Sequence, residues 1–495
     1  MVDILLTDPQ KRRLSEWRYR SQGRTLTDVV FGPLWDVLVR LVPATVAPNV
    51  LTLAGLLCVL PRGIDGRHAR ATRNDSPLGE LFDYACANLG GIFLALTLAY
   101  VAGVTQTSTL WYMSQAFGLA YLLWHLRGLA TGTLHWGFTT GPGEALFAII
   151  AFVATRAIVG VDAVAAAWSH AVDAVLVPSI NAVAHWAATV DISVAVGATK
   201  VAYVEAARLR ALELLQDTDA LLEAVAFGVY VVLVVSVAVY AVLAIPSERS
   251  ATRNGMLLCL LYGALMPSLH SWLNASLFIE PGDVSLHAII FDGAMLSVLT
   301  TDVVVAKMAG RDLHPWVVVF FMVGSFDHFV CGALAGAYFV LIFWEVCEAT
   351  HLPMFTTVIN VYVDGVYDLM HYGHLRVLRA ALSFGSHLIV GVVGDASVNQ
   401  YKHRTPVMSL DERVSAVRAS GLATRVIPDS PCFGLSEEFI LENHIHLVVH
   451  SVEYETEDDI YYRVPRAMGI TRVLPRTEGI STSELIRRIR TRDDL

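Results

Sequence analysis

Stretches of about 20 apolar residues recur along the chain up to residue 345 and are absent beyond it. That length is what a helix needs to cross a bilayer. The pattern therefore predicts spanning helices at 88–104, 110–130, 144–168, 220–245, 254–272, 286–306 and 316–345. The segment 199–224 has the spacing of one amphipathic helix, which either lies on a membrane surface or connects two spans.

Short apolar runs alternate with amphipathic segments after residue 355. The runs Thr356–Val363 and Leu388–Val393 are rich in β-branched residues, as buried strands are. Between them a helical pattern begins near His374, where leucines recur on one face. This order predicts a βαβ unit with parallel strands.

These two patterns divide the chain. We expect a multi-pass α-helical membrane domain over residues 1–348, a linker over 349–355 and an α/β Rossmann-like domain with a parallel sheet over 356–495. The composition agrees, because only 16% of the residues are charged and the mean hydropathy is +0.54. Soluble proteins carry roughly a quarter charged residues.

The charge and the cysteines indicate which partners and which cellular compartment to expect. The net charge of −10 argues against a nucleic-acid partner. The basic segment 11–24 is expected on the cytosolic side of the membrane, and no signal peptide is expected before it. The six cysteines have neither metal-ligand nor disulfide spacing, which suits a reducing compartment.

Two polar motifs interrupt the α/β pattern. VYVDGVYDLMHYGH covers residues 361–374, and RTEGISTS covers residues 476–483. The first motif places His371 and His374 where a strand ends and a helix begins. A helix N-terminus attracts phosphate through its free N–H groups and its dipole. The motif therefore indicates phosphate chemistry.

Together with Lys402, these motifs resemble the cytidylyltransferases that make CDP-choline, CDP-ethanolamine and CDP-glycerol, over residues 357–490. The resemblance implies a nucleotidyltransferase fold, CTP as a substrate and Mg²⁺ with the CTP. A phosphomonoester oxygen would attack the α-phosphate, and pyrophosphate would leave. Because this nucleophile is already an anion, catalysis needs positioning and charge neutralisation more than a strong base.

The resemblance also assigns roles to single residues. Ser481 or Ser483 is expected to cap the last helix, and the hydroxyls of Ser481 and Thr482 to hold the β- and γ-phosphates. The implied catalytic residues are His371, His374, Lys402 and Arg476. The implied CTP- or substrate-binding residues are Val366, Tyr367, Asp368, His450, Tyr454, Thr477, Ile480, Ser481 and Thr482.

Simpler roles remain open beside these. Asp364 and Asp368 are expected to organise the loop between strand and helix rather than to do chemistry. The alternatives for the catalytic set are a turn cap for His371, a plain helix start for His374, a solvated side chain for Lys402 and a surface ion pair of Arg476 with Glu478.

The N-terminal half carries APNVLTLAG at residues 47–55 and DGRHARATRNDSPLGELFDYACANL at residues 65–89. Both resemble eukaryotic choline/ethanolamine phosphotransferases, whose aspartates hold two divalent metals and supply a general base. The resemblance implies Asp65 and Asp83 as metal ligands. Arg62 and Ala87 stand where that family has aspartates, which opposes metal binding and removes the base. The apolar segment ending at Leu60 is also shorter than in that family.

The alcohol substrate is suggested by two replacements. Cys432 stands where choline enzymes have a tryptophan, and Ser451 where they have an acidic residue. A weakened aromatic cage favours a primary ammonium, which donates hydrogen bonds, over trimethylammonium. We therefore expect phosphoethanolamine rather than phosphocholine. A cationic pocket remains open for Tyr454, Asp458, Asp459 and Tyr461.

Three functions compete on these residues. The first is a membrane-anchored cytidylyltransferase with a degenerate phosphotransferase half. The second is a bifunctional enzyme that also transfers the phosphoalcohol to diacylglycerol, and the third is a non-catalytic scaffold. The expected partners are CTP, phosphoethanolamine or phosphocholine and membrane lipids, without nucleic acid, and a homodimer is left open. The expected location is the endoplasmic reticulum membrane, with the catalytic domain in the cytosol.

Overall fold

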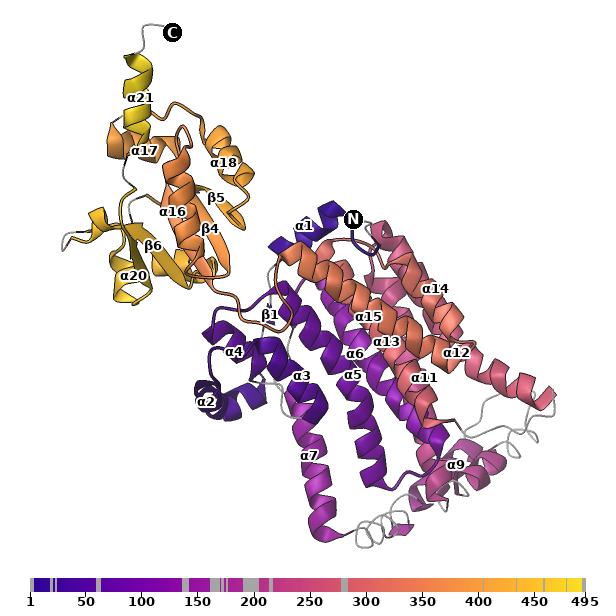
Figure 1. Ribbon diagram of the computed structural model, residues 1–495. Helices are drawn as coiled ribbons and strands as arrows, with labels where there is room; N and C mark the ends of the chain where they lie inside the picture. Colours follow the sequence, from indigo (N-terminus) through magenta and orange to yellow (C-terminus); the bar gives the residue numbers. More distant parts are fainter. Residues whose placement is uncertain are drawn as a thin grey trace. The chain divides into compact units, whose positions relative to one another are not determined.

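The computed structural model describes residues 4–17, 21–22, 25–58, 64–135, 142–160, 170, 173–174, 177–189, 204–212, 217–276, 284–403, 405–432, 434–456, 459–477 and 479–491 (Figure 1). They form two compact units. The first consists of Met1–Arg40, Leu51–Ile64 and Ser76–Thr350, and the second of Leu41–Val50, Asp65–Asp75 and His351–Leu495. Two short N-terminal segments thus belong to the same unit as the C-terminal residues.

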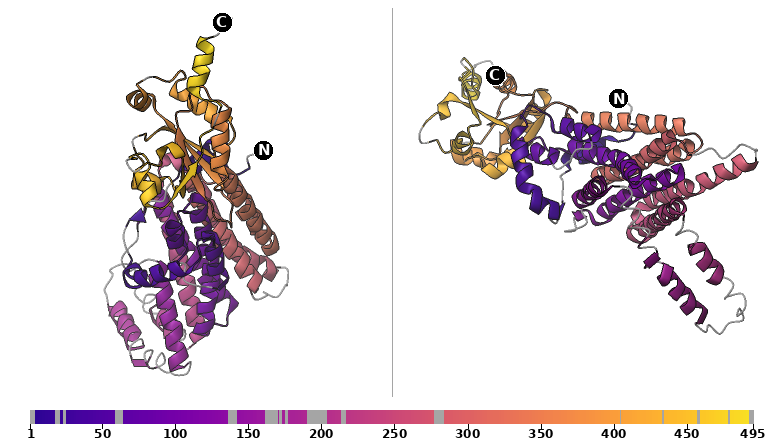
Figure 2. Two further views of the ribbon diagram at one scale, coloured as in Figure 1. Left: turned by 60° about the vertical axis from the view of Figure 1, so that its left-hand side comes forward. Right: turned by 90° about the horizontal axis from the view of Figure 1, so that it is seen from below.

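The first unit is helical, apart from a two-stranded parallel sheet of β1 (Ser21–Gln22) and β2 (Leu134–His135). Helix α13 is its most buried long helix, and α5, α6 and α15 pack against it. Figure 2 shows the helices of this unit from two further directions. The helices are α1 (Asp8–Glu16), α2 (Leu26–Leu41), α3 (Pro48–Cys58), α5 (Pro77–Ala102), α6 (Thr107–Thr131), α7 (Pro142–Val159), α9 (Val177–Thr189), α11 (Thr218–Ala244), α12 (Ser250–Ser276), α13 (Leu286–Ala309), α14 (Pro315–Gly324) and α15 (His328–Thr350), with a short 3₁₀ turn at Ser247–Arg249.

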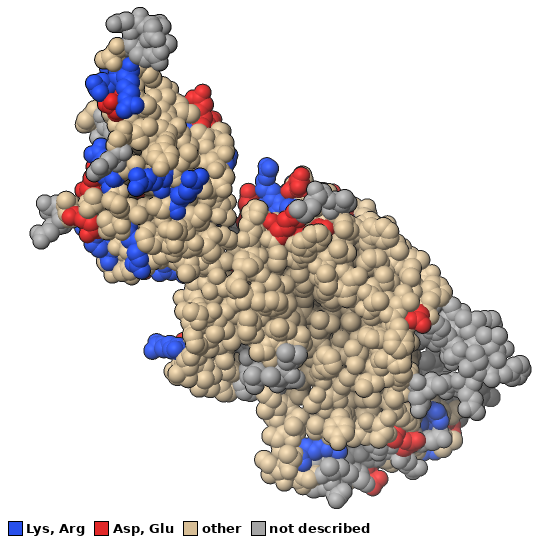
Figure 3. Space-filling model, viewed as in Figure 1, with Lys and Arg blue, Asp and Glu red and all other residues tan. Residues whose placement is uncertain are grey.

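Four helices among the described residues are long and apolar enough to cross a membrane: Pro77–Ala102, Asp219–Ala244, Leu286–Ala309 and His328–Thr350. They lie at four of the predicted spans. Figure 3 shows few charged side chains along the flanks of the helices on the face in view. The predicted spans at 110–130 and 254–272 are helices, α6 and α12, but they are not among these four.

The predicted helix boundaries need two corrections. The span predicted at 316–345 is two helices, α14 and α15, because the carboxylate of Asp327 accepts the N–H of Val330 at 2.9 Å and starts a new helix. The single helix predicted at 199–224 is also wrong. Asp217 has extended backbone and caps α11, so a separate helix, α11, begins at Thr218. Residues 161–168 of the predicted span at 144–168 lie outside the described residues.

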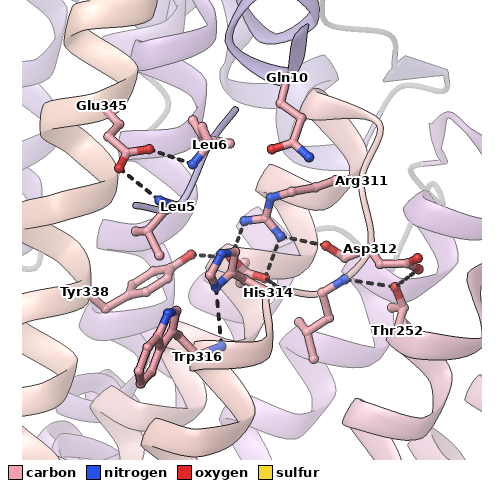
Figure 4. A network of polar contacts seen from close by, with 12 residues as sticks. Leu5, Leu6, Gln10, Thr252, Arg311, Asp312, His314, Trp316, Tyr338 and Glu345 are labelled. Atoms are coloured by element: carbon pink, nitrogen blue, oxygen red, sulfur yellow. Dashed lines mark hydrogen bonds and ion pairs between the residues drawn. The ribbon is translucent and has the colours of Figure 1, made fainter. Parts of the chain in front are cut away.

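A buried polar network crosses the first unit (Figure 4). The carboxylate of Asp302 accepts both terminal guanidinium nitrogens of Arg311, at 2.5 and 3.0 Å. It also accepts the backbone N–H of His314 and the hydroxyl of Tyr338, each at 2.8 Å. Glu345 accepts the N–H groups of residues 4–6 at 3.0, 2.9 and 2.7 Å, which ties the start of the chain to α15.

The second unit is built on a five-stranded sheet with the order β5-β4-β3-β6-β7, in which every pairing is parallel. Its strands are β3 (Asn360–Gly365), β4 (His387–Val393), β5 (Arg425–Ser430), β6 (Leu447–Ser451) and β7 (Thr471–Leu474). Its helices are α4 (Asp65–Ala71), α16 (Tyr372–Leu382), α17 (Asp395–Lys402), α18 (Leu410–Ala419), α19 (Glu437–Glu442), α20 (Arg463–Ala467) and α21 (Thr482–Arg490), with a 3₁₀ turn at Val452–Tyr454.

Each face of the sheet has its own core, because alternate residues of a strand point to opposite sides. Val361 and Val363 pack on one face against Leu378 of α16 and Val417 of α18. Tyr362 packs on the other face against Ile440 of α19. The predicted βαβ unit is confirmed, and β4 matches the second predicted strand to within a residue. The first strand begins four residues later than predicted and includes Asp364 and Gly365.

Candidate functional site

The loop after β3 lies at the point where the chain changes direction across the sheet. β4 and β5 follow on one side of β3, whereas β6 and β7 lie on the other. In an open parallel sheet, ligands bind beyond the carboxyl ends of the strands at such a switch point. The first sequence motif contains the carboxyl end of β3 and the second follows that of β7, so we expect the site at this edge of the sheet.

His371 and His374 form a reciprocal cap at the start of α16. The Nδ1 of His371 accepts the N–H of Gly373 at 3.1 Å, and the Nδ1 of His374 accepts the N–H of His371 at 3.4 Å. The two rings stack with centroids 4.0 Å apart. The capping role and the chemical role are therefore compatible. Because each Nδ1 accepts a hydrogen bond, the neutral rings carry their protons on Nε2.

The Nε2 of His371 is buried and has no hydrogen-bond partner among the described residues. Burial lowers the pKa of His371 below its ordinary value. The ring is therefore neutral near pH 7 and presents a single N–H donor on its Nε2 side. A donor fixed in this way needs no reorganisation when charge develops on a phosphate.

Gly373 brings the two motifs into contact. A Cβ at this position would lie 2.9 Å from the Cε1 of His371 and 3.0 Å from the Cγ2 of Ile480. The backbone of the first motif thus fits between the His371 ring and the second motif only without a side chain. The predicted residues His371 and Ile480 are therefore neighbours in the structure.

Asp368 organises the loop, as predicted. Its carboxylate accepts the N–H groups of Val407 and Met408 at 3.0 and 2.9 Å, and its carbonyl accepts the hydroxyl of Thr482 at 3.0 Å. The neighbours Tyr367 and Leu369 have left-handed backbone, with φ of 52° and 46°. Such conformations cost free energy in non-glycine residues, and the contacts of Asp368 hold the loop that contains them.

The hydroxyls of the second motif have partners of their own. Ser481 caps α21, and its Oγ accepts the N–H of Glu484 at 3.1 Å, so the predicted cap is found at Ser481. The hydroxyl of Thr482 is donated to the Asp368 carbonyl. The phosphate ligands predicted at this helix are the N–H groups of its first turn together with these hydroxyls. Thr477 is half-buried just before them.

Two of the predicted catalytic cations, Arg476 and Lys402, have no described contact with the histidine pair. Arg476 is 68% exposed and pairs with Glu453 at 2.8 Å. Its predicted partner Glu478 lies outside the described residues. Lys402 is the last residue of α17, and its side chain is outside the described part of the structure. Their roles toward phosphate stay predictions.

Arg413 is an organising residue that the sequence analysis missed. It is fully buried on α18, forms an ion pair with Asp395, and donates to the carbonyls of Val366 and Val393 at 2.6 and 2.8 Å. It thereby joins the carboxyl ends of β3 and β4. The signal for it was an arginine on the apolar face of a helix, in register with Val417.

Aromatic side chains gather around His450 at the end of β6. The ring of His450 stacks on Tyr462 at 4.6 Å, and its Nε2 lies 3.3 Å from Glu455. Tyr462 also meets Tyr454 edge to face, with centroids 5.3 Å apart. The hydroxyl of Tyr462 donates to Asp364 at 2.6 Å. Burial raises the pKa of Asp364 to about 6, although this hydrogen bond opposes the shift.

Asp459, which the sequence left open as part of a cationic pocket, has protein partners for its carboxylate. Its carboxylate is buried and accepts the N–H groups of Tyr461 and Tyr462 and the guanidinium of Arg466, at 3.0, 3.1 and 3.2 Å. Asp458, the other predicted acid, lies outside the described residues.

Several buried polar atoms at this edge of the sheet lack hydrogen-bond partners among the described residues. Among them are the hydroxyl oxygen of Tyr367, the Nε2 of His371 and the Oγ of Ser451. Buried polar groups are nearly always hydrogen-bonded in folded proteins. Their concentration beside β3 and β6 favours this edge as a binding site.

The predicted metal ligands of the N-terminal motif lie in different units. Asp65 starts α4 in the second unit and accepts the N–H of Gly66 at 2.8 Å, whereas Asp83 lies on α5 in the first. Arg62 falls outside the described residues, and Ala87 lies on α5. No group of three or more His, Cys, Asp or Glu among the described residues is arranged to hold a metal ion.

The family model that matches this chain lies within the second unit. Residues 362–488 match the family described as cytidylyltransferase-like. The chain is 40% identical over 136 residues to the ethanolamine-phosphate cytidylyltransferase of Arabidopsis thaliana, which is 26% of this chain and 32% of that protein. It is 36% identical over 134 residues to the Dictyostelium discoideum enzyme of the same name (26% and 37%). It is 38% identical over 136 residues to choline-phosphate cytidylyltransferase A of Homo sapiens (26% and 36%). The chain thus spans about a third of the length of the curated relatives it matches.

Proposed function

From the cytidylyltransferase-like domain at residues 362–488, we propose that this chain transfers the cytidylyl group of CTP to a phosphomonoester. The observation that carries the proposal is the stacked histidine pair at the start of α16. Backbone N–H groups bond to the Nδ1 of both rings, and the buried Nε2 of His371 has no hydrogen-bond partner among the described residues.

The reaction joins a phosphate oxygen of the acceptor to the α-phosphorus of CTP. The bond from that phosphorus to the bridging oxygen breaks, and pyrophosphate departs with the electron pair. His371 and His374 donate from Nε2 to the phosphate oxygens on which charge accumulates. The N-terminus of α21, with Arg476, Thr477 and Ser481, neutralises the departing pyrophosphate. Lys402 adds a further positive charge beside the phosphates.

Mg²⁺ belongs to this proposal as part of the nucleotide substrate. Magnesium in phosphoryl-transfer sites is held largely by substrate phosphates and by water, with one or two carboxylates. The described residues fit this arrangement better than a dedicated metal cage, since no three of their potential ligands lie together. When bound, the ion would offset charge on the triphosphate.

For the acceptor we propose phosphoethanolamine in preference to phosphocholine. Tyr454, Tyr461 and Tyr462 form an aromatic cluster beside His450, but Cys432 supplies no ring and Ser451 no charge. A primary ammonium forms hydrogen bonds to hydroxyl and carbonyl oxygens, whereas trimethylammonium depends on an aromatic cage.

We further propose that the first unit anchors the enzyme in a membrane, with the endoplasmic reticulum as the location and the catalytic unit in the cytosol. The support is the set of four long apolar helices. An anchor would keep the product close to the bilayer where a CDP-alcohol is consumed.

The test is CTP-dependent formation of CDP-ethanolamine by the full chain in detergent. His374→Ala and Lys402→Ala are each expected to lower kcat/KM by about 10²–10⁴-fold. Tyr372→Ala is the matched control, because Tyr372 lies between the two histidines and is 62% exposed. It should retain activity. A wild-type chain that makes no CDP-alcohol from phosphoethanolamine or phosphocholine would refute the proposal, and a preference for phosphocholine would refute the acceptor assignment.

A further inference from the structure

Residues 72–75, which follow α4, form hydrogen bonds and an ion pair at the amino ends of β3 and β6. The side chain of Asn74 accepts the N–H of Val358 at 2.8 Å. Arg73 donates to the carbonyl of Ile445 at 2.5 Å, and its φ of 52° marks a sharp turn at this point. Both partners lie just outside the strands, so these contacts continue the hydrogen bonding of the sheet with side chains from a distant part of the chain.

His446 connects this segment to β3. Its Nδ1 accepts the N–H of Asn360 at 3.0 Å, and its Nε2 lies 2.9 Å from the carbonyl oxygen of Thr72. These contacts require an acceptor at Nδ1 and a donor at Nε2. Only the neutral ring with its proton on Nε2 meets both requirements. A protonated ring would turn a donor toward the N–H of Asn360.

Charged groups surround His446 and affect its pKa and that of Asp75. Arg73 lies on the bound segment, and His444 lies in the turn before β6, where it pairs with Asp75 at 3.2 Å. Burial lowers the pKa of His446, and the positive charges of Arg73 and His444 lower it further, against the hydrogen bond to Thr72. Burial alone would raise the pKa of Asp75, but the hydrogen bond and charge of His444 hold it below its ordinary value.

We propose that residues 72–75 are a latch on the amino end of the sheet, which stays closed only while His446 is neutral. Opening frees the first residues of β3, whose other end carries the loop with His371. The partly exposed His444–Asp75 pair also holds the latch closed. It contributes less than the His446 contacts, because exposed ion pairs are weak and buried mismatched donors are not.

The direction of the pH dependence follows from proton binding. In the open state His446 has its ordinary pKa, whereas in the closed state the pKa is lower. The closed latch therefore binds fewer protons. It is most stable above about pH 6.5 and weakens as the pH falls below that value.

Hydrogen–deuterium exchange on the full chain, resolved to single amides and corrected for intrinsic rates, tests the latch. Between about pH 8 and pH 5, protection of the Val358 and Asn360 amides should fall roughly tenfold or more in the wild-type protein. Asn74→Ala should lower Val358 protection at every pH, because it removes the acceptor of that N–H.

Two histidine variants locate the switch. His446→Gln keeps a donor for Thr72 but cannot be protonated, so its protection should be independent of pH. His444→Gln, two residues away, should keep the wild-type dependence. Wild-type protection that stays constant from about pH 8 to pH 5 would overturn the proposal. So would an undiminished dependence in His446→Gln, or its loss in His444→Gln.

Discussion

Two buried carboxylates, one in each unit, have opposite surroundings. Asp302 in the first unit accepts two guanidinium nitrogens of Arg311, a backbone N–H and a tyrosine hydroxyl. Asp364 in the second unit receives the hydroxyl of Tyr462 and forms no ion pair among the described residues. A carboxylate saturated by fixed donors holds structure. A buried carboxylate without a fixed cation has a perturbed pKa, which is more often found at functional sites.

The same contrast separates the networks around these acids. Asp302 accepts the backbone N–H of His314, the N-cap of α14, and Glu345 accepts N–H groups at the start of the chain, as Figure 4 shows for Glu345. The second unit leaves donors and acceptors of Tyr367, His371 and Ser451 without partners among the described residues. Substitutions in the first network should therefore change stability, and substitutions at the second site should change activity.

The largest effect is expected from Asp302→Ala. It leaves Arg311 buried without its counter-charge, which should destabilise the first unit by about 3–5 kcal/mol. The double variant Asp302→Leu with Arg311→Met removes both charges and should recover most of that loss. Thermal unfolding of the detergent-purified chain measures both. Equal destabilisation in the single and double variants would show that the ion pair is not the cause.

A second prediction separates capping from chemistry at His371. Asparagine is a good helix cap, so His371→Asn should preserve the start of α16 and change stability by less than about 0.5 kcal/mol. It lacks the Nε2 donor, and activity should fall by about 10²–10³-fold. Steady-state kinetics beside thermal unfolding provides the comparison. If the variant loses stability while its activity is unchanged, His371 serves only as a helix cap.

The sequence predicted those parts of the site that depend on local contacts. The four residues from His371 to His374 form both capping hydrogen bonds among themselves, and Gly373 is required where the His371 ring meets Ile480. The strand Leu388–Val393 could be predicted because its apolar run is continuous and every residue of it is buried. Local pattern and tertiary structure agree there.

Distant contacts account for what was not predicted. β3 starts late because the N–H of Val358 bonds to Asn74, 284 residues earlier, rather than to another strand. Arg413 was missed because its carbonyl partners, Val366 and Val393, lie at the carboxyl ends of two strands far from its own helix in the sequence. The assignment of Asp65–Asp75 to the second unit also rests on such contacts, which no periodicity in that segment reveals.

The smallest effect is expected from Asp364→Asn. The folded-state pKa of Asp364 is raised to about 6, so the folded protein binds a proton there that the unfolded chain, with an ordinary pKa near 4, has already released. This group therefore lowers stability as the pH rises from about 4 to 6, and the loss persists above that range. Asparagine still accepts the Tyr462 hydroxyl but carries no charge. The variant should gain about 1–2 kcal/mol at neutral pH and nothing near pH 4, as measured by denaturant unfolding of the second unit within the full chain. A variant equally destabilised at both pH values would mean that the carboxylate is stabilised by contacts beyond Tyr462, and Asp364 would then be a structural acid like Asp302.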